Sequence, residues 1–305
     1  MAILTGISFA LSFVLARKIE NEATPIFQNA IRSTVGFLTF LIICLACGVF
    51  LQAFYLPIIL VLILVISILF TVILGDTAYL VSQKFLGPAK ALAITTITPF
   101  FTILFSIIFL NRAISIQMVF SGMIIGMGVI IITKGEINNS NNKGSNKNGL
   151  KNPALPKMVK GTLWALFTAI SWAIGIALTD FSINQVNQIL DLGILSTMIA
   201  MMVRFLFAFV SLNMIALIER KRMPIPKNRN TWIILFISAM LSYSIGSIFF
   251  GEAVHIVGAV FMSLISTAMP LFTIPFSYII NKEKISKRGF IGVMITLIGV
   301  VLILF

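Results

Sequence analysis

A few ionisable side chains of this sequence lie within long apolar stretches. They are Arg32, Asp76, Asp180, Arg204 and Glu252. Because an ionised group inside hydrocarbon costs several kcal/mol, groups that are kept there face a cavity or an oppositely charged partner. A guanidinium in such a place can bind an anion or a carboxylate, and a carboxyl group can take up and release a proton. Arg32, Asp76 and Arg204 are the first candidates for binding a solute, and Asp76 and Glu252 are the candidates for coupling its movement to protons.

Arg32 and Asp76 are expected at matching depths in a membrane. Arg32 lies about two turns after the start of its apolar stretch, and Asp76 lies about two turns before Lys84, both counted from the same membrane face. With a rise of about 1.5 Å per residue, each lies about 10–12 Å deep. The match favours an Arg32–Asp76 pair. That pair could bind a zwitterion or open on protonation, or it could serve only helix packing.

Aromatic and hydroxyl residues on the same stretches could complete a cavity for a small amphipathic solute. The candidates are Phe9, Trp172, Tyr79, Tyr243, Thr95, Thr96, Ser266 and Thr267. An aromatic residue in a membrane helix can equally serve packing or the interface with water. Pro99 and Pro270 follow the hydroxyl residues, and a proline removes a helix hydrogen bond and frees a carbonyl group that can line a cavity. Both prolines are therefore included in the expected site.

The composition predicts that a membrane surrounds the elements that carry these residues. Hydrophobic residues make up 59% of the chain and charged residues 10%, and the mean hydropathy is +1.09, values that would make a soluble domain aggregate. A span needs about 20 apolar residues, and ten such segments can be placed, which predicts an all-α membrane protein with ten transmembrane helices. The expected helices cover residues 1–16, 25–48, 57–82, 88–110, 114–133, 161–181, 193–218, 231–253, 259–281 and 285–305.

The sequence repeats itself, so the helices fall into two related halves. The stretch 75–133 aligns without a gap onto 246–304, and upstream of it Arg32 meets Arg204. Internal repeats in a membrane chain are typical of secondary transporters, with the solute site between the repeats. The expected division is a first five-helix repeat at 1–133, a polar linker at 134–160 and a second five-helix repeat at 161–305.

The two repeats differ next to their equivalent arginines. Ser247 stands in the second half where the first half has Asp76, so Arg204 lacks an equally placed carboxylate. Arg204 is then available to an anion or carboxylate of a solute. Alternatively, it pairs with Asp180 or Glu252, or its long side chain extends to the membrane surface.

Positive charge is distributed unevenly between the loops. Lys and Arg residues concentrate in the loops after odd-numbered helices, and the loops after even-numbered helices contain only Arg112. The net charge of +13 therefore reflects membrane topology and predicts no nucleic-acid partner. Five helices per repeat put equivalent loops on opposite sides, so the repeats are expected to be inverted. The positive-inside rule then predicts that both termini lie outside. The first helix is short for a span, so the true N-terminus could lie upstream.

Several short motifs occur in a fixed order. They are Ala30-Ile31-Arg32, Gly75-Asp76-Thr77-Ala78-Tyr79, Gly87-Pro88-Ala89 and Thr98-Pro99-Phe100 in the first half, and Met202-Val203-Arg204, Met269-Pro270-Leu271 and Asn281-Lys282-Glu283-Lys284 in the second. With this set, the chain resembles the ten-helix EamA-type members of the drug/metabolite transporter (DMT) superfamily over nearly its whole length. In the first half, Arg112 replaces the glutamate that the family carries near the end of its fourth helix. The resemblance implies export or exchange of small metabolites, amino acids or drugs by alternating access, with both termini cytoplasmic, which opposes the charge count.

The predicted function is a multi-pass secondary transporter of the cell membrane, an exporter or exchanger that acts as a monomer or homodimer on a small-molecule substrate. The expected substrate-binding residues are Arg32, Asp76, Tyr79, Thr96, Pro99, Trp172, Arg204, Tyr243, Thr267 and Pro270. The alternatives are a non-transporting multi-pass membrane protein and a membrane-embedded lipid-modifying enzyme. No catalytic group, metal or cofactor is expected, because the chain has one His, no clustered carboxylates and no phosphate-binding G-x-x-x-x-G-K-[ST] motif, while Cys44 and Cys47 suit packing.

Overall fold

The computed structural model of the chain consists of helices joined by short turns. It describes residues 1–110, 154–218, 225–267, 269–282 and 287–304, together with part of 116–131, and no strand occurs among these residues. Large apolar side chains such as Ile58, Ile218 and Ile279 are exposed on the outside, while many serine and threonine side chains and two arginines are buried. This distribution suits a protein whose solvent is lipid. The predicted all-α class is confirmed.

Six helical stretches of the described chain are long and apolar enough to cross a membrane. They are Pro25–Ala46, Ile58–Leu86, Pro88–Phe105, Pro156–Leu190, Ile194–Ile218 and Arg229–Ser266. The first expected helix is observed as α1 (Ala2–Lys18), which at 17 residues is short for a span. The helix expected at 114–133 lies partly outside the described residues, so the number of ten spans stays a prediction.

The helices of the two halves follow one another in the same order. In the first half they are α1, α2 (Pro25–Ala46), η1 (Phe50–Tyr55), α3 (Ile58–Ile68), η2 (Leu69–Asp76), α4 (Thr77–Leu86), α5 (Pro88–Thr95) and α6 (Thr98–Leu110). In the second half they are α8 (Ala154–Leu190), α9 (Ile194–Ile218), α10 (Arg229–Ala239), η3 (Met240–Gly246), α11 (Ser247–Ser266), α12 (Met269–Asn281) and α13 (Lys287–Leu304). Local sequence sets some of these boundaries. Helix α2, for example, begins after Thr24, whose side chain accepts a hydrogen bond from the Phe27 amide.

Helix α8 is longer than the sequence analysis predicted. The helix expected at 161–181 extends over Ala154–Leu190, a length of 37 residues. Residues 154–160, assigned to the linker, are therefore helical, and the rest of the expected linker lies outside the described residues. The prediction was wrong because it ended the helix with its apolar run. Polar residues such as Asn184 and Asn187 continue the helix, and their side chains bind the neighbouring α11.

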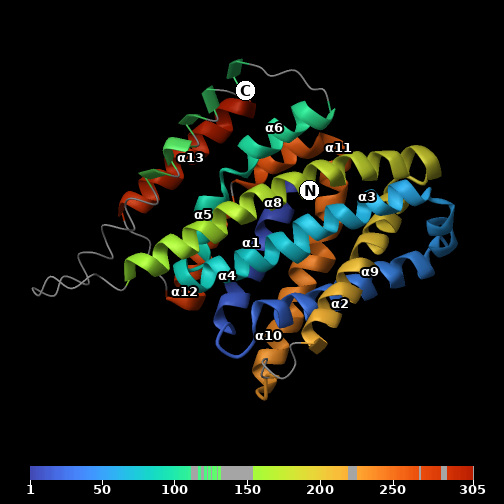
Figure 1. Cartoon of the computed structure of the whole chain (residues 1–305), viewed down its shortest axis with the longest axis horizontal. Helices are drawn as coiled ribbons and strands as arrows, with labels where there is room; N and C mark the ends of the chain where they lie inside the picture. Colours follow the sequence, from blue (N-terminus) through green and yellow to red (C-terminus); the bar gives the residue numbers. More distant parts are fainter. Residues whose placement is uncertain are drawn as a thin grey trace, which may run out of the picture.

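The first two helices of each half pack against the other half. Helix α1 lies along α10, η3, α11 and α12, whereas α8 lies along α3, η2, α4, α5 and α6. Helices α2 and α9, which are equivalent in the alignment, pack side by side (Figure 1). Phe40 and Phe205 stack between them with ring centroids 5.5 Å apart. The two halves are therefore interlocked, and a site between them is built by both.

Both halves interrupt their third helix in the same way. The stretches η2 and η3 are π-helical and begin at Leu69 and Met240, which are aligned residues. Further along, Gly87 and Gly258 break the helical path with φ angles of 82° and 78°, which glycine adopts without strain. Because π-helical turns are rare and frequent at functional sites, the residues beside η2 and η3 are the first place to look for a binding site.

Candidate binding cavity

A cavity of about 90 Å³ lies between the two halves, beside η2 and η3. Side chains from α1, α3, α5, α6, α8, α9, α11 and α12 complete its wall. Of the ten residues predicted to bind substrate, those that line the cavity are Asp76, Thr96, Trp172, Arg204, Tyr243 and Thr267. The remaining wall combines apolar side chains, including Phe9, Ile176 and Phe250, with serine and threonine side chains. A solute in this cavity would meet one basic and one acidic side chain among apolar and hydroxyl side chains.

Tyr79, Pro99 and Pro270 are buried near the cavity but do not line it. The Tyr79 hydroxyl donates a hydrogen bond to the Pro88 carbonyl oxygen at 3.1 Å. The two prolines stand in the first turns of α6 and α12, just after the breaks that separate these helices from α5 and α11. A proline fits there because the first turn needs no amide donor. The prolines therefore fix where the helices restart, and the threonines before them form the cavity wall.

Two residues of the second half hold the carboxylate of Asp76. The Trp172 indole donates to Oδ1 at 2.8 Å, and the Tyr243 hydroxyl donates to Oδ2 at 2.5 Å. The same indole N–H lies 3.2 Å from the carbonyl oxygen of Thr71, within η2. Asp76 is 5% exposed. Both of its oxygens thus accept hydrogen bonds in a buried place, where hydrogen bonds to a charged group are strong.

Arg32 lies behind Tyr243 and does not contact Asp76. Its Nη1 donates to Asn29 Oδ1 at 3.0 Å, its Nη2 to Ser12 at 3.2 Å and its Nε to Ser242 at 3.1 Å. The guanidinium carbon also lies 4.4 Å from the centre of the Tyr243 ring. The predicted Arg32–Asp76 pair is wrong as a direct contact, because a tyrosine from the other half separates the two charges. Arg32 is also absent from the cavity wall.

Arg204 lies in the cavity wall and is 2% exposed. Its Nε donates to Ser67 Oγ at 3.0 Å, its Nη2 to Thr71 Oγ1 at 3.1 Å and its Nη1 to Met201 Sδ at 3.1 Å. Among the described residues, no carboxylate lies within ion-pair distance of Arg204. The two alternatives of pairing with an acidic residue and of extending to the membrane surface are therefore both wrong.

The two arginines make equivalent contacts at equivalent positions. Each donates to a hydroxyl group on the third helix of the other half, and each donates to the residue three positions before it, which is Asn29 for Arg32 and Met201 for Arg204. The difference is chemical, since an amide oxygen is a good acceptor and a thioether sulfur a weak one. Arg32 is well satisfied within the protein, whereas Arg204 is less so and faces the cavity.

Sequence reasoning missed the hydroxyl residues that hold these arginines. They are Ser12, Ser67, Thr71 and Ser242. A signal was available in the repeat, because Ser67 aligns with Ser238, and Thr71 aligns with Ser242. Aligned hydroxyls in an apolar helix indicate shared polar partners.

Glu252, the second candidate for proton coupling, lies on α11 and does not line the cavity. It is buried, and its Oε1 has no hydrogen-bond partner among the described residues. One turn later, His255 contacts two asparagine side chains of α8. Asp180 of α8 accepts a hydrogen bond from the Ala259 amide at 2.9 Å, directly after the glycine break in α11. These contacts hold α8 to that break.

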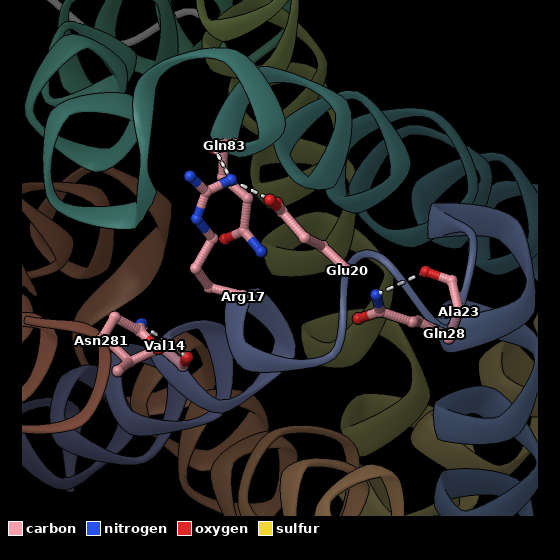
Figure 2. Close-up of polar contacts among 7 residues, drawn as sticks. All are labelled: Val14, Arg17, Glu20, Ala23, Gln28, Gln83 and Asn281. Carbon is pink, nitrogen blue, oxygen red and sulfur yellow. Dashed lines mark hydrogen bonds and ion pairs between the residues drawn. The ribbon is translucent and has the colours of Figure 1, made fainter. Parts of the chain in front are cut away.

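The last turn of α1 carries a second group of polar contacts (Figure 2). Arg17 donates to the carbonyl oxygen of Gln83 in α4 at 2.8 Å and forms an ion pair with Glu20. Asn281 of α12 donates to the carbonyl oxygen of Val14 at 3.0 Å. These contacts join α1 to one helix of its own half and to one helix of the other half. They therefore hold the three helices together at this end of α1.

Comparison with known proteins identifies the kind of chain that carries this arrangement. A family model described as the EamA-like transporter family matches residues 1–134 and 159–305. A curated protein from Archaeoglobus fulgidus, described as an uncharacterized transporter, is 24% identical over 245 residues, which cover 80% of this chain and 76% of that protein. A solved structure, described only as the crystal structure of a protein, superposes with a TM-score of 0.65 at 16% identity and covers 99% of this chain and 96% of its own. That likeness concerns the fold alone.

Proposed function

This chain belongs to the EamA-like transporter family, and we propose that it is a secondary transporter that exports or exchanges a small metabolite by alternating access. The observation that carries the proposal is the cavity between the interlocked halves, with Arg204 and Asp76 in a wall of apolar and hydroxyl side chains. A polar solute that leaves water for the middle of a membrane needs such groups to replace its hydration. Membership of a transporter family disfavours both a lipid-modifying enzyme and a membrane protein without transport activity.

We further propose ten spans in the cell membrane, arranged as two inverted five-helix repeats at 1–133 and 161–305. The family match in two parts and the aligned π-helical stretches support this division. The positive charge of the odd-numbered loops favours an outside position for both termini. One chain builds the whole cavity, so transport needs no second copy even if the protein forms homodimers.

In this mechanism the cavity opens to one side of the membrane at a time. The contacts of Arg17 and Asn281 hold α1 to α4 and α12, and the contacts of Asp180 and His255 hold α8 to α11. Rocking of the halves would break one group of contacts while the other is kept. The glycine breaks at 87 and 258 give the helices points at which to bend.

Asp76 is the better of the two candidates for proton coupling. It lines the cavity and is held by side chains of the other half, so its protonation would weaken contacts between the halves and change the charge that a solute meets. Glu252 lies outside the cavity wall. Plain exchange without protons is the competing mechanism, and the Asp76→Asn variant described in the Discussion separates the two.

The experiment that tests transport first measures solute binding and then measures solute movement across a membrane. The purified protein is screened by thermal shift against amino acids, nucleobases, sugar phosphates, organic acids and organic cations, since a ligand at 100 times its Kd adds about 2.7 kcal/mol to the stability of the folded state. Compounds that shift the melting temperature are then tested for counterflow in proteoliposomes. We expect counterflow that is lost in Arg204→Gln and kept in Cys47→Ser, a change at an exposed position outside the cavity. Counterflow of none of these compounds would contradict the proposal.

A further inference from the structure

The buried charges around the cavity do not cancel. Asp76 and Arg32 lie on either side of Tyr243, which binds both, so they form one balanced set. Arg204 has only neutral acceptors, and in the described part of the chain no carboxylate is within ion-pair distance of it. The cavity wall therefore carries one uncompensated positive charge.

Arg204 keeps donors for a ligand. A guanidinium has five N–H groups, and three of them donate to Ser67, Thr71 and the Met201 sulfur. Each terminal nitrogen retains one further N–H. Two such groups form the fork with which an arginine binds a carboxylate through parallel hydrogen bonds. The bond to sulfur is the weakest of the three, so a ligand oxygen can also replace it.

Asp76 offers little attraction to an ammonium group, because its charge is already balanced. Its two oxygens each accept one hydrogen bond, from Trp172 and Tyr243, and Arg32 lies on the other side of the Tyr243 ring. The other buried carboxylates of the described residues, those of Asp180 and Glu252, do not line the cavity. An ammonium group that entered would lose its hydration and meet hydroxyl groups but no uncompensated carboxylate, which is costly.

We propose that the transported solute is a small organic monoanion. Its carboxylate binds Arg204, and its apolar body packs against Phe9, Ile176 and Phe250. This inference rests on the proposed transport function and names the substrate class of the same cavity. One negative charge balances the site, whereas a zwitterion adds an unpartnered ammonium group and a dianion adds an unpartnered negative charge.

The size of the cavity limits the solute further. Its volume of about 90 Å³ is several times the minimum of about 10–15 Å³ that holds one water molecule, so the cavity admits a small solute. A short branched carboxylic acid such as isocaproate combines one carboxylate with a small apolar body. Isocaproate is also leucine without its ammonium group, so a set of ligands exists that share a branched apolar body and differ in their charged groups: isocaproate, leucine, isoamylamine and the neutral isocaproamide.

The protein contains its own reporter for binding. Of its three tryptophans, Trp172 lines the cavity, while Trp164 and Trp232 are 36% and 39% exposed and do not line it. The double variant Trp164→Phe, Trp232→Phe leaves Trp172 as the single indole. Titration of this variant in detergent, followed by fluorescence, measures binding without transport. We expect isocaproate to bind at least about 10-fold more tightly than the other three compounds, as a charge-assisted hydrogen bond implies.

Two further changes, each made in this background, test the role of charge. Arg204→Gln should weaken isocaproate binding about 10- to 100-fold, the equivalent of a lost charge-assisted hydrogen bond. Ser247→Asp places a carboxylate at the position aligned with Asp76, in the wall that Arg204 shares. It should abolish the preference for isocaproate over isocaproamide, because Arg204 then has a counter-ion within the protein. If Arg204→Gln does not fold, Ser247→Asp still gives the answer.

Several results would overturn the inference. One is tighter binding of leucine or isoamylamine than of isocaproate. Another is an unchanged preference in Ser247→Asp, and a third is the absence of binding by every monocarboxylate from acetate to octanoate and benzoate. None of these results contradicts transport as such. The proposed function fails separately, if no compound in the broader panel shows counterflow.

Discussion

Tyr243 of the second half donates a hydrogen bond to Asp76 of the first half, with 2.5 Å between the hydroxyl and carboxylate oxygens. The same ring covers the guanidinium of Arg32, whose central carbon lies 4.4 Å from the ring centre. One side chain therefore separates a buried cation from a buried anion and binds both. The polar centre of the protein consequently depends on both halves at once.

Removal of the Tyr243 hydroxyl should weaken the contact between the halves. Tyr243→Phe keeps the ring over Arg32 but leaves Asp76 without one of its donors. The loss of a hydrogen bond to a charged group predicts a cost of about 1.5–3 kcal/mol in stability, measured by thermal or denaturant unfolding in detergent. Tyr79→Phe is the matched control for transport, because the Tyr79 hydroxyl bonds to the Pro88 carbonyl outside the cavity wall. Equal transport defects in both variants would count against a special role for Tyr243.

Neutralising the two equivalent arginines should have opposite effects on the stability of the protein. Arg32→Gln removes a cation bonded to three side chains and leaves the buried carboxylate of Asp76 uncompensated, so we expect a loss of about 3 kcal/mol or more. Arg204→Gln removes an uncompensated charge, and the protein should fold with unchanged or higher melting temperature while solute binding is lost. The yield after size-exclusion chromatography and the melting temperature are measured for both variants. A lower stability of Arg204→Gln than of Arg32→Gln would contradict the assignment of Arg32 to structure and of Arg204 to solute binding.

Asp76→Asn separates proton coupling from exchange. The amide keeps an oxygen for one of the two donors, Trp172 or Tyr243, but it cannot release a proton. If Asp76 couples protons, uptake driven by a pH gradient should disappear in proteoliposomes while counterflow continues. An equal loss of both activities would assign Asp76 a purely structural role.

Gly75→Ala should disturb the cavity through its aromatic wall. A methyl group at Gly75 would lie 2.5 Å from Cδ1 of Trp172 and 2.7 Å from the carbonyl oxygen of Phe70, so the indole must shift. Because overpacking costs about 1–3 kcal/mol, we expect lower stability together with weaker binding. The control is Gly6→Ala, whose nearest neighbours lie at an ordinary 3.7 Å. Normal binding in Gly75→Ala would show that Trp172 can move without consequence.

The two free cysteines test the orientation of the chain. Cys47 is exposed at the end of α2, and Cys44 is buried. If the charge of the loops sets the topology, Cys47 lies outside, and a membrane-impermeant maleimide should label intact cells that express the protein. Labelling should vanish in Cys47→Ser and persist in Cys44→Ser. Labelling of Cys47 only after permeabilisation would support the cytoplasmic termini that the family resemblance implies.

Much of the cavity could be predicted because ionisable side chains are rare in the apolar stretches of this sequence. Arg204 and Asp76 could therefore be chosen as binding-site residues from their positions in the chain alone. Aligning the halves then added Trp172, Thr96 and Thr267, all of which lie in the wall. The repeat also indicated that Arg32 and Arg204 occupy equivalent positions, and in the structure they make equivalent contacts.

The partners of these residues could not be predicted from one sequence. The depth of a residue in the membrane follows from counting residues along its helix, and the expected match in depth between Arg32 and Asp76 used only that count. Contact also depends on the rotation of each helix and on which helices are neighbours. The helices of the first half pack largely on the second, so Tyr243, more than 160 residues away in the chain from Asp76, takes the place between them. The length of α8 was underestimated for a related reason. Beyond its apolar run, this helix continues because neighbouring helices contact its polar residues.

The crosswise packing has a consequence for biosynthesis. Arg32 bonds to Ser12 and Asn29 of the first half and to Ser242, which is 210 residues later in the chain, so a newly inserted first half holds this cation before its third partner has been made. The ribosome must complete much of the second half before Arg32 has all of its partners. A chain that stops after the first half would also leave the buried carboxylate of Asp76 without Trp172 and Tyr243, both of its donors. We therefore expect the two halves to reach the folded state together, at the end of synthesis.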